Sequence, residues 1–192
     1  MRLLIYGSSD FGRVLRRQLA ACGHEFEGFI DDVVGGPDVL GGYENVRDRF
    51  PPAAGRGIVM AVGYNHLEAR WTLYGRVRGD GYALPALLHP AAHVHPEATV
   101  GEGAIVGAGA NVDAGARVGP LAVLWPGAIV SHDSEIGDNT FLSPGAIVCG
   151  LARVGAHSFI GAGAVVPDHA DLAPATFLAA GRVAARRPAP PA

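Results

Sequence analysis

The pattern of hydrophobic and polar residues changes near residue 85, and the longer second part of the chain repeats every six positions. An aliphatic residue recurs there sixteen times in unbroken register. A small residue (Ala, Ser or Thr) follows four places after each of the first fifteen, and only Arg182 breaks this rule. The aliphatic residues are Leu88, Val94, Val100, Val106, Val112, Val118, Leu124, Val130, Ile136, Leu142, Val148, Val154, Ile160, Val166, Leu172 and Leu178.

A period of six fits neither an α-helix, which repeats every 3.6 residues, nor a free strand, which repeats every two. It fits a chain wound as a triangular prism, in which each side uses one hexad and three hexads complete a coil. The aliphatic residue points inward, the small residue fits the crowded corner, and frequent Gly supplies backbone conformations that other residues resist. The fifteen hexads from Val94 therefore predict a parallel β-helix of five coils within residues 85–183.

The first 84 residues lack this period and alternate between short apolar runs and amphipathic stretches. The apolar runs predict four strands, at 3–6, 26–30, 57–62 and 82–88. Two helices are predicted between them, one over 11–22 that Gly23 ends and one over about 65–77. A strand, a glycine loop, a helix and a second strand open a doubly wound α/β unit, so residues 1–84 are expected to form a Rossmann-like domain.

Composition narrows the class of protein. The chain is rich in Gly (28) and Pro (14), but 49% of its residues are hydrophobic, which argues against disorder. A net charge of −3 offers no basic excess to nucleic acid. Cys22 and Cys149 form no C-x-x-C motif, and no secretory signal or apolar run of membrane-spanning length is present. We therefore expect a cytoplasmic protein that binds neither nucleic acid nor membrane, with a flexible Arg- and Pro-rich tail at 184–192.

The loop from Gly7 to Gly12 is the first candidate site. Ser9 stands where the dinucleotide fingerprint G-x-G-x-x-G has its middle Gly, which argues against NAD. The helix that follows still offers free N–H groups and its positive dipole end to the phosphates of a nucleotide, and Asp31 lies where a ribose-binding acid is expected. The alternative is a plain strand–turn–helix in which Ser9 caps the helix and Asp31 is an ordinary loop acid.

His132 is the second candidate. It follows the inward-facing Val130 by two residues, so it lies at a corner of the prism and points outward. Eighteen residues away, on the neighbouring coils, Ala114 and Gly150 leave open space beside it. Histidine is a natural general base near neutral pH, and Asp133 could orient its ring. The alternative is a solvated corner histidine beside a solvated carboxylate.

Two further groups carry weaker signals. No two of the eight histidines lie eighteen residues apart, so no metal site is expected. Arg182, Arg186 and Arg187 could meet a phosphorylated cofactor such as coenzyme A, or could equally form a solubilising tail.

Several motifs resemble one bacterial family. They are the glycine loop after the first strand, Phe29-Ile30-Asp31-Asp32, Ala61-Val62-Gly63 with Asn65, Leu88-His89-Pro90 and His132-Asp133. In this combination the chain resembles, over essentially its whole length, the nucleotide-sugar acetyltransferases related to sialic acid O-acetyltransferases. The resemblance implies a Rossmann-like domain followed by a left-handed β-helix, assembled as a homotrimer with active sites between subunits. It also implies transfer of an acetyl group from acetyl-CoA to the amino group of a nucleotide-linked amino sugar, without a metal ion.

The resemblance assigns roles to individual residues. It implies that His132 is the general base, that Asp133 orients it, and that N–H groups near Gly145 or Gly150 steady the thioester oxygen. The nucleotide-sugar set it implies is Gly7, Ser8, Ser9, Asp10, Phe11, Gly12, Asp31, Asp32, Gly63 and Asn65. The acetyl-CoA set it implies is Phe141, Ser143, Gly145, Gly150, Gly161, Ala162 and Arg182.

The chain departs from the family pattern at three positions, one of which is Arg182, where the core takes a small residue. Asp10 places a negative charge near the proposed phosphates, and Phe141 stands where some members carry a second histidine. Three other functions stay open: a sugar O-acetyltransferase that uses the same base, a non-catalytic scaffold that binds nucleotide sugars, and a metal-dependent hydratase.

Overall fold

A computed structural model describes residues 1–185, which form two compact units: Met1–Leu87, and a second unit that begins at Leu88. Arg186, Arg187 and the rest of the predicted tail from residue 186 onward lie outside the described residues. Within residues 1–185, no helix combines the length and apolar character needed to cross a membrane.

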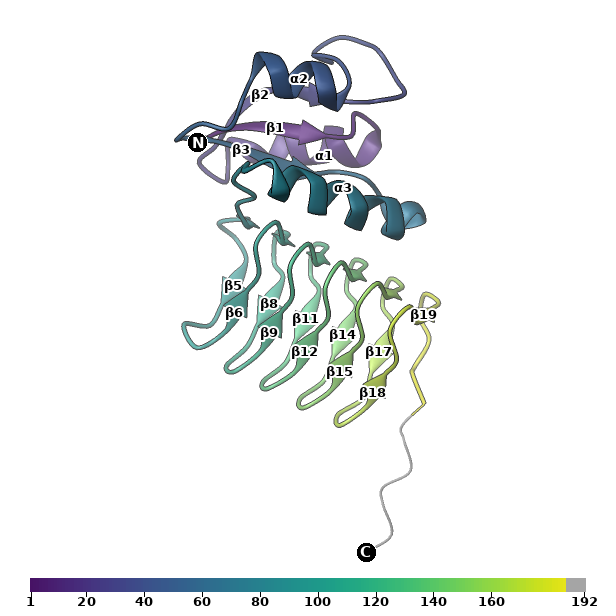
Figure 1. Cartoon of the computed structure of the whole chain (residues 1–192). Coiled ribbons are helices and arrows are strands. Elements are labelled where there is room, and N and C mark those ends of the chain that lie inside the picture. Colours follow the sequence, from purple (N-terminus) through teal and green to yellow (C-terminus); the bar gives the residue numbers. More distant parts are fainter. Residues whose placement is uncertain (186–192) are drawn as a thin grey trace, which may run out of the picture. The chain divides into compact units, whose positions relative to one another are not determined.

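The first unit is a three-stranded parallel sheet in the order β2-β1-β3, with α1 packed on β1 and β2 and α3 packed on β3 (Figure 1). Its elements are β1 (Arg2–Tyr6), α1 (Asp10–Leu19), β2 (Glu25–Ile30), α2 (Tyr43–Arg49), β3 (Arg56–Met60), a short 3-10 helix η1 (Tyr64–His66) and α3 (Leu67–Gly79). Four of the five residues of β1 are buried, as expected for a central strand covered on both faces.

Two features of this unit differ from the sequence prediction. Residues 82–88 do not form a fourth strand of its sheet: only Ala83 makes an isolated parallel bridge, to Gly57, and Leu87–Leu88 is the first strand of the prism. Pro85 has no N–H to give to a sheet ladder, which is a physical reason for the break. The short helix α2 has little apolar periodicity and was not predicted.

The second unit is the predicted prism, whose coils stack side by side in Figure 1. Its three faces are parallel sheets of two-residue strands, which we call the apolar, middle and charged faces after their outward side chains. The apolar face contains β4 (Leu87–Leu88), β7 (Ile105–Val106), β10 (Val123–Leu124), β13 (Phe141–Leu142), β16 (Phe159–Ile160) and β19 (Phe177–Leu178). The middle face contains β5 (His93–Val94), β8 (Asn111–Val112), β11 (Ile129–Val130), β14 (Ile147–Val148) and β17 (Val165–Val166). The charged face contains β6 (Thr99–Val100), β9 (Arg117–Val118), β12 (Glu135–Ile136), β15 (Arg153–Val154) and β18 (Asp171–Leu172).

The predicted register is confirmed, because the second residue of every prism strand is a member of the aliphatic series. Paired strands place residues eighteen apart directly over one another, as Val130 lies between Val112 and Val148. The aliphatic residues and the small corner residues form one core cluster along the prism. Buried hydroxyls replace Ala at some corners and satisfy themselves locally, as when Thr140 donates to the Gly155 carbonyl oxygen at 3.1 Å.

From Gly103 onward, each turn between faces contains one residue in the left-handed backbone region. Between the apolar and middle faces this residue is Gly in every coil from Gly109 to Gly181, and we call this the glycine corner. Between the middle and charged faces it is Gly115, Asp133, Leu151 and His169 in successive coils, and we call this the histidine corner because it carries His132. Asp tolerates the left-handed region better than most residues, so Asp133 occupies this position at modest cost.

The crowded corner positions should be the least tolerant part of the prism. We expect Ala128→Leu to destabilise the chain by about 1–3 kcal/mol, because Ala128 is fully buried between Ala110 and Ala146 and has no room for a larger side chain. Urea unfolding monitored by circular dichroism measures this. Ala162→Leu, at an exposed corner position, is the matched control and should stay close to wild type. Equal stability of the two variants would contradict the inference that the corner at Ala128 has no room for a larger side chain.

Candidate active site

The histidine corner brings two of the predicted site residues together. His132 Nδ1 lies 3.0 Å from Asp133 Oδ2, and the two side chains are 57% and 60% exposed. An ionised Asp133 fixes the proton on Nδ1 of a neutral ring and leaves a lone pair on Nε2. This is the arrangement of a general base with its orienting carboxylate. Because the pair is exposed, it adds little to folding stability.

Glycines flank this pair on the coils before and after it. A Cβ placed on Gly150 would lie only 2.5 Å from His132 Nε2, and a Cβ on Gly115 would collide with the Asp133 carboxylate. The imidazole therefore lies against the bare backbone of Gly150. The sequence had singled out Gly150 but not Gly115, although 133 minus 18 identifies it by the same arithmetic.

Gly150 also offers a hydrogen-bond donor. Its N–H donates to no other group among residues 1–185, whereas the Gly145 N–H is bound to the Pro126 carbonyl oxygen at 3.2 Å. The prism does not need an N–H at this place in the repeat, since Pro holds it in six hexads: Pro90, Pro96, Pro120, Pro126, Pro144 and Pro174. Of the two donors predicted near a thioester, only that of Gly150 is available.

Most residues of the predicted acetyl-CoA set lie at a different corner. Ser143, Gly145, Gly161, Ala162 and Arg182 belong to turns of the glycine corner in successive coils. Phe141 belongs to β13 of the apolar face and is buried. The glycine and histidine corners bound opposite edges of the middle face, so one prism does not bring these residues to His132.

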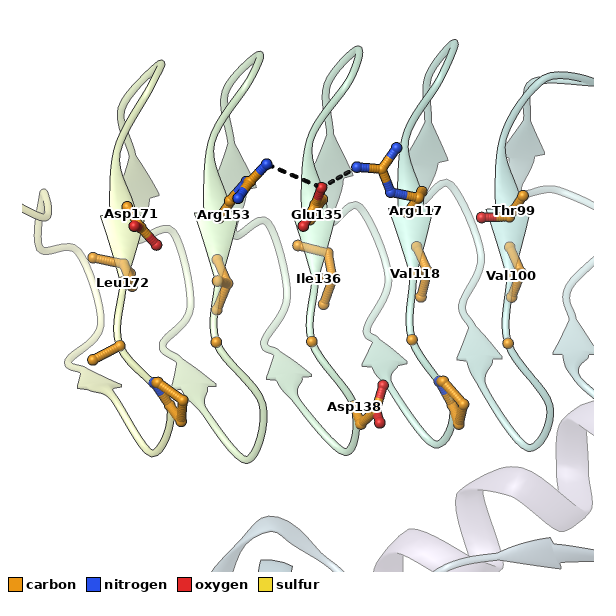
Figure 2. Close-up of a pocket in the computed structure, with 18 residues that line it drawn as sticks. Thr99, Val100, Arg117, Val118, Glu135, Ile136, Asp138, Arg153, Asp171 and Leu172 are labelled. Carbon is orange, nitrogen blue, oxygen red and sulfur yellow. Dashed lines mark hydrogen bonds and ion pairs between the residues drawn. The ribbon is translucent and has the colours of Figure 1, made fainter.

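A groove of about 780 Å³ runs along the charged face, and none of the predicted site residues lines it. Figure 2 shows its outward side chains in a row, with Glu135 between Arg117 and Arg153. Glu135 accepts from Arg117 and lies 3.5 Å from Arg153, so the charges of this row largely neutralise one another. The groove is therefore an open surface whose arginine and glutamate side chains pair with one another.

In the first unit, the predicted nucleotide-sugar residues gather at one edge of the sheet. Since β1, β2 and β3 are parallel, the loops at 7–12, 31–32 and 61–65 all leave their carboxyl ends. Backbone bonds tie the starts of two loops to neighbouring strands: the Gly7 N–H donates to Ile30 at the end of β2, and the Ala61 N–H donates to Tyr6 at the end of β1. This edge is where open α/β sheets bind ligands.

Glycine is required at both ends of the first loop. Gly7 has a φ of +112°, and its missing Cβ would lie 2.8 Å from the Ala61 carbonyl oxygen. A Cβ on Gly12 would collide with the Gly7 carbonyl oxygen, so α1 can start close to β1. Ser9 is at the N-cap position of α1, but its side chain makes no capping bond. Asp10 in the first turn is fully exposed and lies 3.7 Å from Arg13.

Asp31 uses its carboxylate to hold these loops together. Oδ2 accepts from the Ser8 hydroxyl at 2.6 Å and the Ser8 N–H at 3.0 Å, and Oδ1 accepts from the N–H groups of Val33 and Val34. Burial alone would raise the pKa of Asp31, but these hydrogen bonds outweigh it and lower the pKa to about 2. Asp31 therefore braces the glycine loop, and its oxygens are already engaged within the chain.

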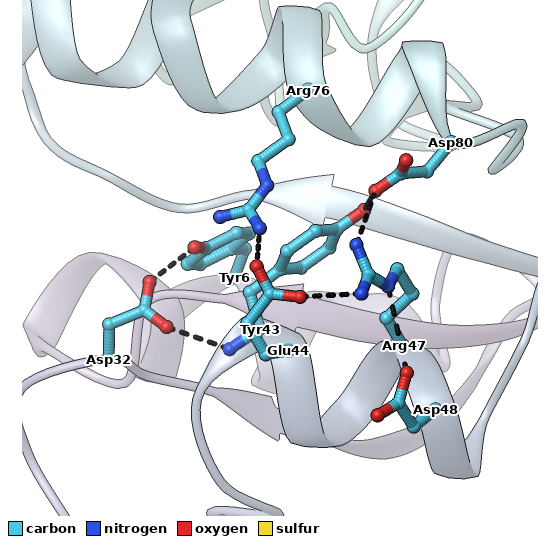
Figure 3. Close-up of polar contacts among 8 residues, drawn as sticks. All are labelled: Tyr6, Asp32, Tyr43, Glu44, Arg47, Asp48, Arg76 and Asp80. Carbon is cyan, nitrogen blue, oxygen red and sulfur yellow. Dashed lines mark hydrogen bonds and ion pairs between the residues drawn. The ribbon is translucent and has the colours of Figure 1, made fainter.

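Asp32 is engaged in the same way (Figure 3). Its carboxylate accepts from the Tyr6 hydroxyl and, at 2.7 Å, from the Tyr43 N–H at the start of α2. The Tyr6 and Tyr43 rings stack at 5.5 Å, and Tyr43 donates to Asp80 at 2.8 Å. Burial first, and then these carboxylates, raise the pKa of both tyrosines. The sequence could not reveal that Asp32 caps a helix eleven residues further on.

Next to the glycine loop is a cavity of about 290 Å³, lined by Ser8, Phe29, Arg13, Arg16 and the 34–39 loop. Arg16 is paired with Asp38 at 2.7 Å, while the side chain of Arg13 is 63% exposed.

The last two residues of the predicted nucleotide-sugar set follow β3. Gly63 precedes η1, and Asn65 lies exposed within η1. Within residues 1–185, no three His, Cys, Asp or Glu side chains gather in a way that could hold a metal ion.

The bracing role of Asp31 has a consequence for acid stability. Its pKa lies below the ordinary 3.8, so it stabilises the fold above that value and the stabilisation disappears as the pH falls through about 2. We expect wild type to lose roughly 2 kcal/mol more than Asp31→Asn between pH 5 and pH 2. Urea unfolding across this range measures the difference. Asp10→Asn, at a fully exposed carboxylate, should lose the same stability as wild type over this pH range. If Asp31→Asn also loses as much stability as wild type between pH 5 and pH 2, Asp31 does not hold the loops together.

Two comparisons use the sequence alone. The family model "Bacterial transferase hexapeptide (six repeats)" matches residues 133–168, which lie within the prism. A search of curated proteins found no match.

Solved structures match over nearly the whole chain. The acetyltransferase domain of PglB from Neisseria gonorrhoeae is 28% identical with a TM-score of 0.84, covering 96% of this chain and 91% of that one. The same domain in complex with acetyl coenzyme A matches with a TM-score of 0.83, at 28% identity over 94% of this chain and 88% of that one. PerB from Caulobacter crescentus, in complex with CoA and GDP-perosamine, is 28% identical with a TM-score of 0.74, covering 92% of this chain and 93% of that one.

These likenesses extend over both units and confirm a left-handed β-helix preceded by an α/β unit. The repeat, the fold and the matches together indicate an acyltransferase that is similar to bacterial sugar acetyltransferases.

Proposed function

We propose that this protein transfers the acetyl group of acetyl-CoA to the amino group of a nucleotide-linked amino sugar. The observation that carries the proposal is the His132–Asp133 pair on an outward corner of an acyltransferase prism, where the carboxylate lies at Nδ1 and leaves Nε2 for a substrate. The matched structures support the substrate classes, because one was solved with acetyl coenzyme A and another with CoA and GDP-perosamine.

The chemistry follows from the geometry of the corner. Asp133 keeps the proton of His132 on Nδ1, so Nε2 accepts the proton that the sugar amine loses as its nitrogen attacks the thioester carbonyl carbon. The Gly150 N–H has no partner among residues 1–185 and belongs to the backbone beside this ring, so it is free to stabilise the negative oxygen that develops. When the carbon–sulfur bond breaks, protonated His132 returns its proton to the leaving thiolate.

The first unit would hold the nucleotide. The carboxyl edge of its sheet offers the N-terminus of α1 and the exposed Arg13 to a diphosphate. Since the oxygens of Asp31 and Asp32 are engaged within the chain, we assign these two residues to shaping the loops.

The same base could activate a hydroxyl group, so O-acetylation of a sugar is the second candidate function. It is favoured only by the fact that His132 does not distinguish the two nucleophiles.

Assembly into a homotrimer would complete the site. His132 and the glycine-corner residues Gly161, Ala162 and Arg182 lie along opposite edges of the middle face, so a neighbouring copy is needed to bring the two corners together. The outward side chains of the last three strands of that face, Ile129, Ile147 and Val165, are apolar, which suits a surface that protein covers. A cyclic arrangement repeats the same contact three times.

Replacing the base tests the function directly. His132→Ala should lower kcat/KM for thiol release from acetyl-CoA by about 10²–10⁴-fold, because proton transfer from the amine is lost. Thiol release would be followed with UDP-, dTDP- and GDP-linked amino sugars, and with the corresponding hydroxyl sugars. His93→Ala, at an outward position of another coil, is the control. Turnover of an amino sugar that survives in His132→Ala would remove His132 from the mechanism, and turnover of hydroxyl sugars alone would favour O-acetylation.

Mixing two inactive variants tests the shared site. His132→Ala removes the base, and Ala162→Trp blocks the glycine corner at an exposed position. If each site takes one corner from each of two copies, random cyclic trimers of the two variants should recover about a quarter of wild-type activity. Two measurements provide the baselines. One is the activity of each variant alone, and the other is the activity of a chain that carries both changes, mixed with either single variant. A mixture that stays inactive, although it forms mixed oligomers, would contradict the site between copies.

A further inference from the structure

The ring of His132 lies in the space that a side chain on Gly150 would occupy. An ideal Cβ on Gly150 would lie 2.5 Å from Nε2, 2.7 Å from Cε1 and 3.1 Å from Cδ2 of that ring. The ring atom nearest to this Cβ position is Nε2, the nitrogen that would accept the proton. The place that the ring occupies exists because residue 150 has no side chain.

The prism itself does not require glycine at this position. Gly150 is not among the residues with a positive φ, so an L-residue fits its backbone conformation. The same place in the repeat is held by Ala in five other hexads: Ala108, Ala114, Ala156, Ala162 and Ala180. The fold therefore accepts a Cβ here wherever no imidazole lies in the coil before.

We propose that Gly150 is a positioning residue for His132: its missing Cβ lets the imidazole lie against the backbone while Nδ1 stays on Asp133. This inference rests on the proposed function, in which His132 is the base. To make room for a Cβ at ordinary contact distance, about 3.5 Å, Nε2 would have to retreat by about 1 Å. A misplacement of this size at a reacting group can cost as much as about 10²-fold in rate.

Asp133 restricts how the ring can respond. It holds Nδ1 at 3.0 Å, and its own carboxylate lies where a Cβ on Gly115 would be. The pair is thus set between two glycines, one in the coil before and one in the coil after. A ring pushed away from residue 150 must lengthen or misalign its bond to Asp133, and both changes weaken the base.

Gly150→Ala is the test, because it adds the Cβ and keeps the N–H. We expect kcat to fall by about 10–100-fold while KM for both substrates changes less than about threefold, since only the base is displaced. The ¹⁵N and ¹H signals of the His132 ring, identified by their loss in His132→Ala, should shift in Gly150→Ala. Ala156→Gly, which removes a Cβ from the same place in the repeat, is the matched control and should leave kcat and these signals unchanged.

Each result decides the proposal. A kcat within threefold of wild type would overturn it, and so would ring signals that do not move. A Gly150→Ala chain that fails to fold would also overturn it, because the glycine would then serve the prism rather than the ring. If wild type shows no acetyl transfer, the proposed function fails independently of this inference. Ring signals that move in Gly150→Ala but not in Ala156→Gly would then still show that Gly150 positions the His132 ring.

Discussion

Backbone hydrogen bonds between successive coils fix the neighbours of every side chain in the prism. The Ile129 N–H donates to Ala146 at 2.8 Å and the Ser131 N–H to Val148 at 2.9 Å, and this pairing repeats along all three faces. Each residue therefore lies between the residues eighteen places before and after it. Because parallel strands cannot slip without turning aliphatic residues outward, the register of the core also fixes the surface.

The surface follows from this stacking in three different ways. On the charged face, Glu135 lies between two arginines and the row neutralises itself. On the apolar face, Phe159 and Phe177 stack at 5.2 Å. At the histidine corner, the neighbours of the reactive pair are glycines, so the imidazole and the carboxylate occupy space that side chains fill elsewhere. The reactive corner is the place where the stacking leaves room.

The two units differ in how far the sequence determines them. A period of six was sufficient to predict every prism strand and the outward direction of His132, because its contacts repeat. The first unit has no such repeat, and its decisive bonds join distant positions: Ser8 to Asp31, and Asp32 to the start of α2. Both carboxylates fit the family pattern for nucleotide binding in the sequence, yet each turns its oxygens toward the protein. Local patterns cannot reveal such bonds, and they also overestimated the strand at 82–88, where Pro85 interrupts the ladder.

In the proposed reaction, Gly150 meets two demands that no other residue type meets together. Proline suits the prism at this place and occurs there in other coils, but it would remove the N–H that we assign to stabilising the developing oxyanion. Alanine also suits the prism, and it keeps the N–H, but its Cβ would displace the imidazole. The fold accepts all three residues, whereas the base and the oxyanion donor together accept only glycine. A single position one coil after His132 can therefore control both the placing of the base and the stabilisation of charge, because stacking puts both next to the same ring.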